Sequence, residues 1–155
     1  MTRLAAMDSN VLIALMDRQD KWHSQAKLLW NALKDQNFSL IYLDCVLNET
    51  ISVLARRAHE QNRSAEFVSL LDELLHQIPE RLITWVSGDI PRLFRDIVEI
   101  VRQSGGALNF HDALIALSCL ELGVRIIVSL DEDFDRISWL RRIASVADIQ
   151  RSLSV

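Results

Sequence analysis

Four carboxylates stand at positions where a solvated surface charge would be unusual. They are Asp8, Glu49, Asp112 and Asp131. Asp8 directly follows the apolar run RLAAM, and Asp131 directly follows the run IIVSL. An acid that ends a strand in this way lies at the carboxyl edge of a sheet, where α/β proteins bind ligands. Glu49 and Asp112 fall in segments too apolar to form a solvated helix face, so we expect the four acids to belong to a site.

Carboxylates that are brought together need a counter-charge. Like charges at close range raise one another's pKa and cannot all stay ionised, so a bound cation is expected. Ligands that are all oxygen suit Mg²⁺ or Mn²⁺, whereas zinc favours His or Cys. Magnesium is usually bound alongside substrate phosphates, which indicates phosphoryl chemistry. The alternative for each single acid is a helix cap, the commoner role of an Asp after a strand.

Two other acid-based sites fit the sequence poorly. The segment DEDFD begins like a calcium-binding EF-hand loop, but Arg136 stands where the loop needs Gly and Arg142 where it needs Glu. Asp8 could be the nucleophile of a phosphatase that passes through an aspartyl phosphate, but no second Asp follows two residues later to act as the acid.

The elements that must position these acids alternate between strand and helix. Short runs rich in apolar and β-branched residues predict strands, and apolar residues at three- and four-residue spacing predict helices. Strands are expected at residues 3–8, 39–43, 82–86 and 124–129 and near Ser145-Val146, and helices at residues 9–16, 22–33, 46–59, 65–75, 87–101 and 109–122. This alternation predicts an α/β fold with a parallel sheet that is covered on both faces.

Composition limits the remaining classes of protein. The chain has 155 residues, 50% of them hydrophobic, with four glycines and two prolines, which favours a single folded domain over residues 1–155. The net charge of −4 does not indicate a polyanion partner. Cys45 and Cys119 stand apart from any metal-binding pattern and are expected to be buried thiols. No apolar run is long enough to span a membrane, and a cytoplasmic protein is expected.

Three segments, taken in order, resemble the PIN domain, and specifically the VapC-like toxin ribonucleases of bacterial toxin–antitoxin pairs. MDSNVLIAL resembles the first motif of that family, an acid after the first strand followed by Ser or Thr. LNETISVLARR resembles the second, a Glu on a helix. NFHDALIALSCLELGVRIIVSLDEDFDRI resembles the last pair, an Asp that opens a helix and an acidic loop after a strand. The resemblance covers most of the chain.

The resemblance implies a three-layer α/β/α sandwich and a metal-dependent endoribonuclease. Mg²⁺ or Mn²⁺ would be held by Asp8, Glu49, Asp112 and Asp131, with Asp133 at an outer position, and would promote hydrolysis of RNA phosphodiester bonds. Ser129 is expected to support these ligands by hydrogen bonding. Ser9 and Asn10 either orient Asp8, contact phosphate or simply cap a helix.

The resemblance also implies a small cognate antitoxin that covers the site, and a homodimer. Two alternatives remain. One is a PIN-like RNA-processing nuclease outside any toxin pair, which the neighbouring gene would distinguish. The other is a PIN-fold module that binds RNA or protein without catalysis.

Several residues outside the acid set have two possible roles. Arg56, Arg57 and Arg63 follow Glu49 on what the pattern predicts to be one helix, where they either lie along the RNA path or end a solvated helix. Trp22 and Trp30 share a helical face with apolar residues, which favours packing over base stacking. If the chain stays extended after Asp131, then Asp133 faces the same way and Glu132 the other.

Overall fold

A parallel sheet forms the centre of the molecule in the computed structural model, which describes residues 2–154. Its five strands are β1 (Arg3–Met7), β2 (Phe38–Leu43), β3 (Ile83–Thr84), β4 (Ile126–Val128) and β5 (Arg141–Ile143). They lie in the order β3-β2-β1-β4-β5, and every neighbouring pair is parallel. The prediction of an α/β fold with a parallel sheet is confirmed.

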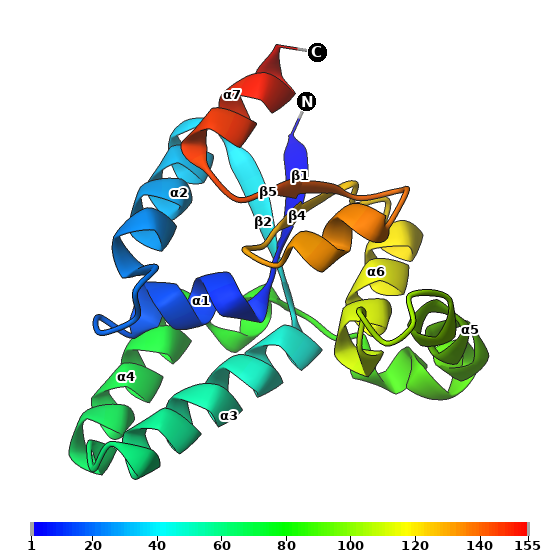
Figure 1. Cartoon of the computed structure of the whole chain (residues 1–155). Helices are drawn as coiled ribbons and strands as arrows, with labels where there is room; N and C mark the ends of the chain where they lie inside the picture. Colours follow the sequence, from blue (N-terminus) through cyan, green and yellow to red (C-terminus); the bar gives the residue numbers. More distant parts are fainter. Residues whose placement is uncertain (1, 155) are drawn as a thin grey trace.

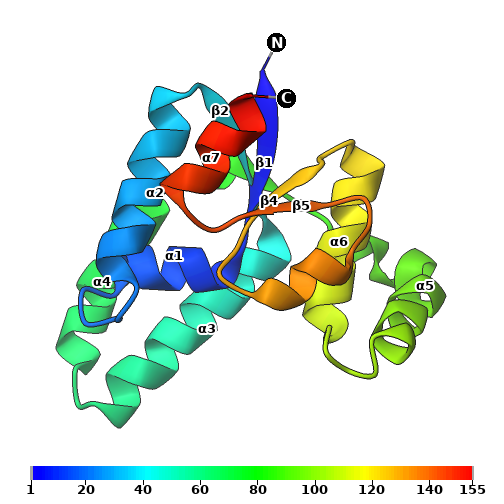
Figure 2. The ribbon, with the colours of Figure 1, turned by 45° about the horizontal axis from the view of Figure 1, so that its top comes forward.

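Helices cover both faces of this sheet. They are α1 (Ser9–Met16), α2 (His23–Asp35), α3 (Asp44–Glu60), α4 (Ser64–Gln77), α5 (Ile90–Gln103), α6 (Phe110–Leu122) and α7 (Val146–Leu153), with short 3₁₀ turns η1 (Glu80–Leu82), η2 (Ser87–Asp89) and η3 (Glu132–Arg136). Helices α2 and α7 lie side by side on one side of the strands, and α5 and α6 pack together on the other (Figures 1 and 2). This arrangement is the three-layer sandwich that was expected.

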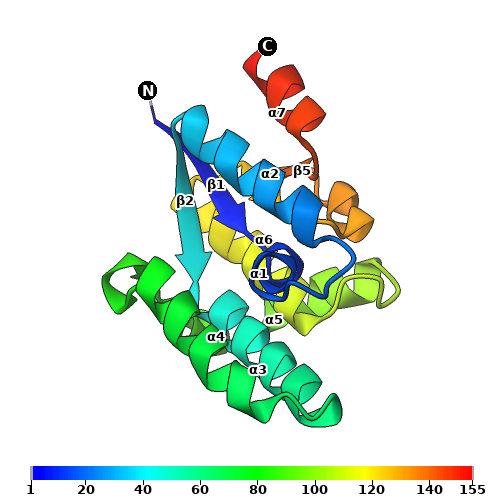
Figure 3. The ribbon, with the colours of Figure 1, turned by 90° about the vertical axis from the view of Figure 1, so that its left-hand side faces the viewer.

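The central strand explains why the acids converge. The chain runs outward from β1 to β2 and β3, then returns to place β4 on the other side of β1. The order of strands therefore reverses between β1 and β4, and the crevice beyond such a reversal is the usual ligand site of α/β sheets. Figure 3 shows β1 and β2 pointing toward α1 and toward the hairpin of α3 and α4.

Helix ends are set by the residues that the sequence indicated. Asp8 caps α1, and Asn109 forms a capping box with Asp112 at the start of α6. Gly123 ends α6 in the left-handed conformation, with a φ of 69° that a residue with a Cβ rarely adopts. The predicted helix between Asn109 and Gly123 is thus confirmed.

The C-terminal part differs from its prediction. No strand forms at Ser145-Val146; the strand is Arg141–Ile143, and Ser145 instead caps α7 with Asp148 in a second capping box. The prediction was wrong because β5 pairs through its backbone with β4, placing Ile143 beside Val128, while the Ser-x-x-Asp pattern starts a helix.

The interior matches the predicted burial of the thiols. Cys45 and Cys119 are free and buried, and burial raises the pKa of each to about 12. Within residues 2–154, no helix combines the length and apolar composition needed to cross a bilayer.

Candidate active site

Asp8 is the most enclosed carboxylate of the predicted set. Its side chain is only 4% exposed, and both of its oxygens accept hydrogen bonds. Oδ1 accepts from the backbone amide of Ser9 at 2.8 Å, whereas Oδ2 accepts from Ser129 Oγ at 2.6 Å and Asn10 Nδ2 at 3.1 Å. Strand β1 delivers Asp8 to the sheet edge, and the Asp8 amide bonds to the Val128 carbonyl of β4 at 3.0 Å. Asp8 is therefore held between the two strands where the sheet order reverses.

Glu49 reaches the same site from helix α3. Its Oε2 accepts a hydrogen bond from Ser9 Oγ at 2.9 Å, so a single serine bridges Asp8 and Glu49 through its amide and its hydroxyl. Asn10 makes a second bridge: its Nδ2 donates to Ser129 Oγ at 3.2 Å, and its Oδ1 accepts from the Leu130 amide at 3.1 Å. Ser9 and Asn10 thus hold the acid-bearing segments together as well as starting α1.

In both Asp112 and Asp131, one carboxylate oxygen accepts a hydrogen bond from a backbone amide at the start of a helix or 3₁₀ turn. Asp112 Oδ2 accepts from the Asn109 amide, and Asp131 Oδ1 accepts from the Asp133 amide, both at 2.9 Å. Throughout residues 2–154, the second oxygen of each, and Oε1 of Glu49, receives no hydrogen bond from the protein. Each of these three acids therefore keeps an oxygen available to a ligand.

The acids influence one another electrostatically. The pKa of Asp8 is raised to about 7, chiefly by burial and in smaller part by the charges of Asp112 and Glu49, against the lowering effect of the hydrogen bonds from Ser129 and Ser9. Burial is also the main cause of the raised pKa of Asp112, and the charges of Asp131 and Glu49 add to it. The four predicted acids are thus brought within reach of one another's fields.

None of these four acids forms an ion pair with a Lys, Arg or His side chain in the described part of the chain. A cluster of four carboxylates, two of them with raised pKa values and none of them ion-paired, is a suitable environment for a bound cation. Residues 2–154 nevertheless contain no group of three or more His, Cys, Asp or Glu side chains that could hold a metal ion as they are placed. The donor types fit Mg²⁺ or Mn²⁺, but the arrangement is more open than a direct three-carboxylate site.

The loop after β4 differs from the extended geometry that was expected. Asp131 caps the 3₁₀ turn η3, so the chain turns instead of continuing as a strand. Asp133 is about two-fifths exposed and pairs with Arg136 at 3.2 Å. The expectation that Asp133 faces the same way as Asp131 because the strand continues was wrong, since the Asp131 cap at the Asp133 amide favours a turn over a strand. Phe134 does turn inward and is fully buried.

The three arginines that follow Glu49 are also arranged differently from the prediction. Helix α3 ends at Glu60, and Arg63 caps the next helix, α4, so Arg63 does not share a helix face with Arg56 and Glu49. Arg57 is bound by Asp17 at 3.0 Å and by Asp20 at 2.9 Å, and Arg63 lies 3.6 Å from Asp17. The Gln61-Asn62 break, with Asn62 at a φ of 54°, lets the chain reverse between the two helices.

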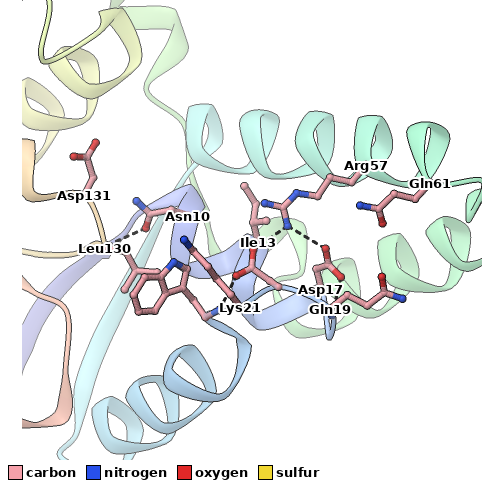
Figure 4. Close-up of a pocket in the computed structure, with 11 residues that line it drawn as sticks. Asn10, Ile13, Asp17, Gln19, Lys21, Arg57, Gln61, Leu130 and Asp131 are labelled. Carbon is pink, nitrogen blue, oxygen red and sulfur yellow. Dashed lines mark hydrogen bonds and ion pairs between the residues drawn. The ribbon is translucent and has the colours of Figure 1, made fainter.

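A groove of about 580 Å³ extends from Asp131, one of the four acids, along α1 and α3. Asn10 and Asp131 lie at one end of it, and Arg57 of α3 and Gln61, directly after α3, lie at the other (Figure 4). Lys21 and Trp22, from the turn between α1 and α2, line the same groove. The sequence favoured core or partner packing for both tryptophans; Trp30 is buried in the core, whereas Trp22 is 42% exposed and is not a core residue.

The groove residues Asp17, Asp20 and Lys21 were missed from the sequence. They belong to the segment DRQDK, which follows an apolar helix and looks like an ordinary polar turn. The only feature of the sequence that could have pointed to a site there is the pair of acids three residues apart. Arg57, the partner of Asp17 and Asp20, lies 40 residues from Asp17, and such a pairing depends on the fold.

Comparisons with known proteins agree with this architecture. A family model described as the PIN domain matches residues 5–140. The solved structure of VapC20 from Mycobacterium tuberculosis, a toxin that cleaves the sarcin-ricin loop, is 22% identical, with a TM-score of 0.66 over 86% of this chain and 95% of that one. VapBC2 from Rickettsia felis, bound to a DNA fragment from its promoter, is 18% identical, with a TM-score of 0.62 over 90% of this chain and 97% of that one. At these identities the likeness shows a shared fold. No curated protein matches the chain.

Proposed function

The chain belongs to the PIN domain family, and we propose that it is a metal-dependent endoribonuclease that hydrolyses RNA phosphodiester bonds. One observation carries the proposal. Four carboxylates from separate segments, Asp8, Glu49, Asp112 and Asp131, gather at the strand reversal and have no Lys, Arg or His partner among the described residues. Four acids that served only as caps would have no reason to be placed within one another's fields at this edge.

The chain's own residues have distinct roles in this proposal. Asp8, Glu49, Asp112 and Asp131 would hold Mg²⁺ or Mn²⁺, with Asp133 in an outer role, and the ion would supply stabilisation of negative charge on the phosphate and activation of water. Ser9, Asn10 and Ser129 fix the direction of Asp8 and Glu49 through the hydrogen bonds described above. Mg²⁺ usually keeps several of its bound waters. Carboxylates that are too far apart to contact the ion directly can therefore hold it through hydrogen bonds to those waters.

The likeness in fold to VapC20 and VapBC2 supports a narrower proposal. We propose that residues 1–155 form a single PIN nuclease domain that acts in the cytoplasm as the toxin of a toxin–antitoxin pair. A small antitoxin encoded by the adjacent gene would cover the groove beside Asp131, and the toxin would form a homodimer. An adjacent gene for a small protein that copurifies with the chain and suppresses cleavage would support this assignment.

A second candidate function is favoured by one observation. As placed in residues 2–154, no three ligating side chains form a group that could hold a metal ion. A PIN-fold module that binds RNA without cleaving it would have this property. It would bind RNA equally well with a chelator and with magnesium, and would leave the RNA intact in both.

The deciding experiment incubates the purified protein with total cellular RNA in the presence of Mg²⁺, Mn²⁺ or a chelator, and maps the new ends by sequencing. We expect discrete internal cuts with either metal ion and none with the chelator. Asp112→Asn should abolish the cuts. Intact RNA under all three conditions, with RNA still bound, would favour the binding module. Cleavage that persists in the chelator would contradict the proposed metal chemistry.

A further inference from the structure

An exposed tryptophan lies on the wall of the groove that leads from the acids. Trp22 precedes helix α2, leaves 42% of its surface exposed, and shares the groove with Asn10 and Asp131. An exposed tryptophan ring in a groove is a surface on which a nucleic-acid base can stack. Trp85 is more exposed still, at 66%, but does not line this groove.

The turn that carries Trp22 is held in place by hydrogen bonds. The Trp22 amide donates to Asp20 Oδ1 at 2.8 Å, and the other oxygen of Asp20 accepts from Arg57 at 2.9 Å. Asp17 is only 3% exposed. Its carboxylate accepts one hydrogen bond from Arg57 and another from the Gln19 amide, each at 3.0 Å. This network fixes the turn against α3, so the start of α2 that carries the ring is anchored before any ligand arrives.

Charge in the groove is unevenly distributed. Asp17 and Asp20 are paired with Arg57, and Asp17 also lies 3.6 Å from Arg63, so the two acids and the two arginines balance in charge. Lys21 forms no ion pair within the described residues, and its ammonium lies over the Trp22 ring, 5.3 Å from the ring centroid. A base that stacks on this ring must take the other face or displace the flexible Lys21 side chain, and in either case the ammonium is near enough to meet a phosphate of the same unpaired nucleotide.

We propose that this groove holds one unpaired nucleotide of the RNA next to the cleavage site, with its base stacked on Trp22 and a phosphate near Lys21. The inference rests on the proposed ribonuclease function and adds the contact that would favour single-stranded RNA. The occupant is RNA because the groove opens at Asn10 and Asp131, so a strand whose phosphate lies at the acids continues into it. Stacking recognises any base, so the contact would be tolerant of sequence.

The test measures the affinity for a fluorescein-labelled single-stranded RNA of twelve nucleotides by anisotropy, in a chelator so that no cleavage occurs. We expect Trp22→Ala to weaken binding about 5- to 150-fold, the range typical of one lost base stack. Trp22→Tyr should retain most of the affinity because its ring can still stack. Trp85→Ala, the matched control, should bind as the wild type does, and all three variants should keep the wild-type melting temperature because neither side chain is in the core.

A second arm places one abasic nucleotide at each position of the RNA in turn. In the wild type, one position should weaken binding when its base is removed, and in Trp22→Ala that position should no longer matter. Equal affinities of Trp22→Ala and Trp85→Ala for RNA that the wild type binds and cleaves would overturn this inference and leave the proposed function standing. The same result, combined with loss of antitoxin binding in Trp22→Ala, would assign the surface to a protein partner instead. A wild type that neither binds nor cleaves RNA would overturn both proposals.

Discussion

The Ser129 hydroxyl donates a buried hydrogen bond of 2.6 Å to Asp8 Oδ2, joining residues 121 positions apart in the chain. The same hydroxyl oxygen accepts from the Asp131 amide at 3.0 Å and from Asn10 Nδ2 at 3.2 Å. One donor and two lone pairs are all that a serine hydroxyl has, so its hydrogen bonding is complete. The Ser129 hydroxyl thus joins, through hydrogen bonds, the two strand ends that carry Asp8 and Asp131.

Replacing Ser129 by Ala should therefore damage both the fold and the site. The Asp131 amide and Asp8 would each lose a partner in a buried region, and we expect the free energy of unfolding to fall by about 1–3 kcal/mol, together with loss of cleavage. Ser118→Ala is the matched control, because the Ser118 hydroxyl is equally buried but has no hydrogen-bond partner within residues 2–154. Urea unfolding should find Ser118→Ala neutral or stabilising. Equal destabilisation of the two variants would contradict the role given to Ser129.

The two capping-box acids offer a second matched pair. Asp112 and Asp148 each occupy the third position of a helix, and each accepts a hydrogen bond from the amide of the cap residue. Their pKa values shift in opposite directions. Burial is the main cause of the raised pKa of Asp112, whereas hydrogen bonds, with Arg151 among the donors, lower the pKa of Asp148. Asp112→Asn should abolish cleavage and leave the melting temperature without metal unchanged or higher, because it removes one of several repelling charges. Asp8→Asn should behave in the same way.

Asp148→Asn should show the opposite pattern, with cleavage kept and stability reduced by about 0.5–1 kcal/mol, because an attractive charge is lost. Thermal melting in a chelator and an RNA cleavage assay on the same preparations measure both properties. If Asp112→Asn cleaved RNA normally and melted as Asp148→Asn does, Asp112 would be a structural cap only.

The raised pKa of Asp8 predicts how stability changes with pH in the absence of metal. In the folded protein the pKa of Asp8 is about 7, against 3.8 for an ordinary Asp, so between these values the folded state binds more protons than the unfolded state. The contribution of Asp8 to the free energy of unfolding is therefore full below about pH 4 and falls as pH rises toward 7. Asp8→Asn should lack this decline. Urea titrations of both proteins from pH 4 to pH 8 in a chelator would measure the difference.

Added Mg²⁺ should reverse that trend. A carboxylate must lose its proton to bind a cation, so metal binding should strengthen as pH rises through 7 and should stabilise the wild type more than Asp8→Asn. A wild-type protein whose stability did not respond to Mg²⁺ at pH 8 would argue against a metal ion at Asp8.

Local signals predicted most of the framework because they act within a few residues. The apolar run before Asp8, the cap at Asn109 and the stop at Gly123 each place an element end by chemistry that neighbouring residues decide. Asp8 and Asp131 could be predicted to lie together because the carboxyl ends of parallel strands meet at one edge, whereas Glu49 and Asp112 lie on helices and were singled out because their segments are apolar.

The errors occur where distant residues decide the outcome. Whether Arg57 faces RNA or an acid depends on Asp17 and Asp20, which lie 40 and 37 residues away. The exposure of Trp22 depends on the turn that ends α1, whereas its spacing from Trp30 predicted only a shared face. The course of the chain after Asp131 was misjudged because a side-chain cap competes with an extended strand.

The loop from Asp131 to Asp135 gives a graded prediction. Asp131→Asn should abolish cleavage, and Asp133→Asn should reduce it to an intermediate level that extra Mn²⁺ restores, as expected of an outer contact. Glu132→Gln should have little effect because Glu132 is exposed. Asp135→Asn should lower stability instead, since Asp135 binds Arg142 through two hydrogen bonds of 3.0 Å. Single-turnover cleavage rates at two manganese concentrations would rank the four, and Glu132→Gln proving as harmful as Asp131→Asn would overturn the site assignment in this loop.

The arginines near the groove should separate into a structural and a binding class. Arg57→Ala removes the partner of Asp20 and leaves the buried Asp17 with Arg63 alone at 3.6 Å. We expect it to lower the free energy of unfolding by about 1–2 kcal/mol, less than for a fully buried pair because Arg57 is a third exposed.

Arg56 is exposed on α3 and forms no ion pair in the part of the chain that the structure describes, so Arg56→Ala should leave stability unchanged. If Arg56 lies along the RNA path, its loss should lower the slope of log affinity against log salt by about one. Urea unfolding and RNA titrations at several salt concentrations test both statements, and a slope that Arg56→Ala does not change would remove Arg56 from the RNA path.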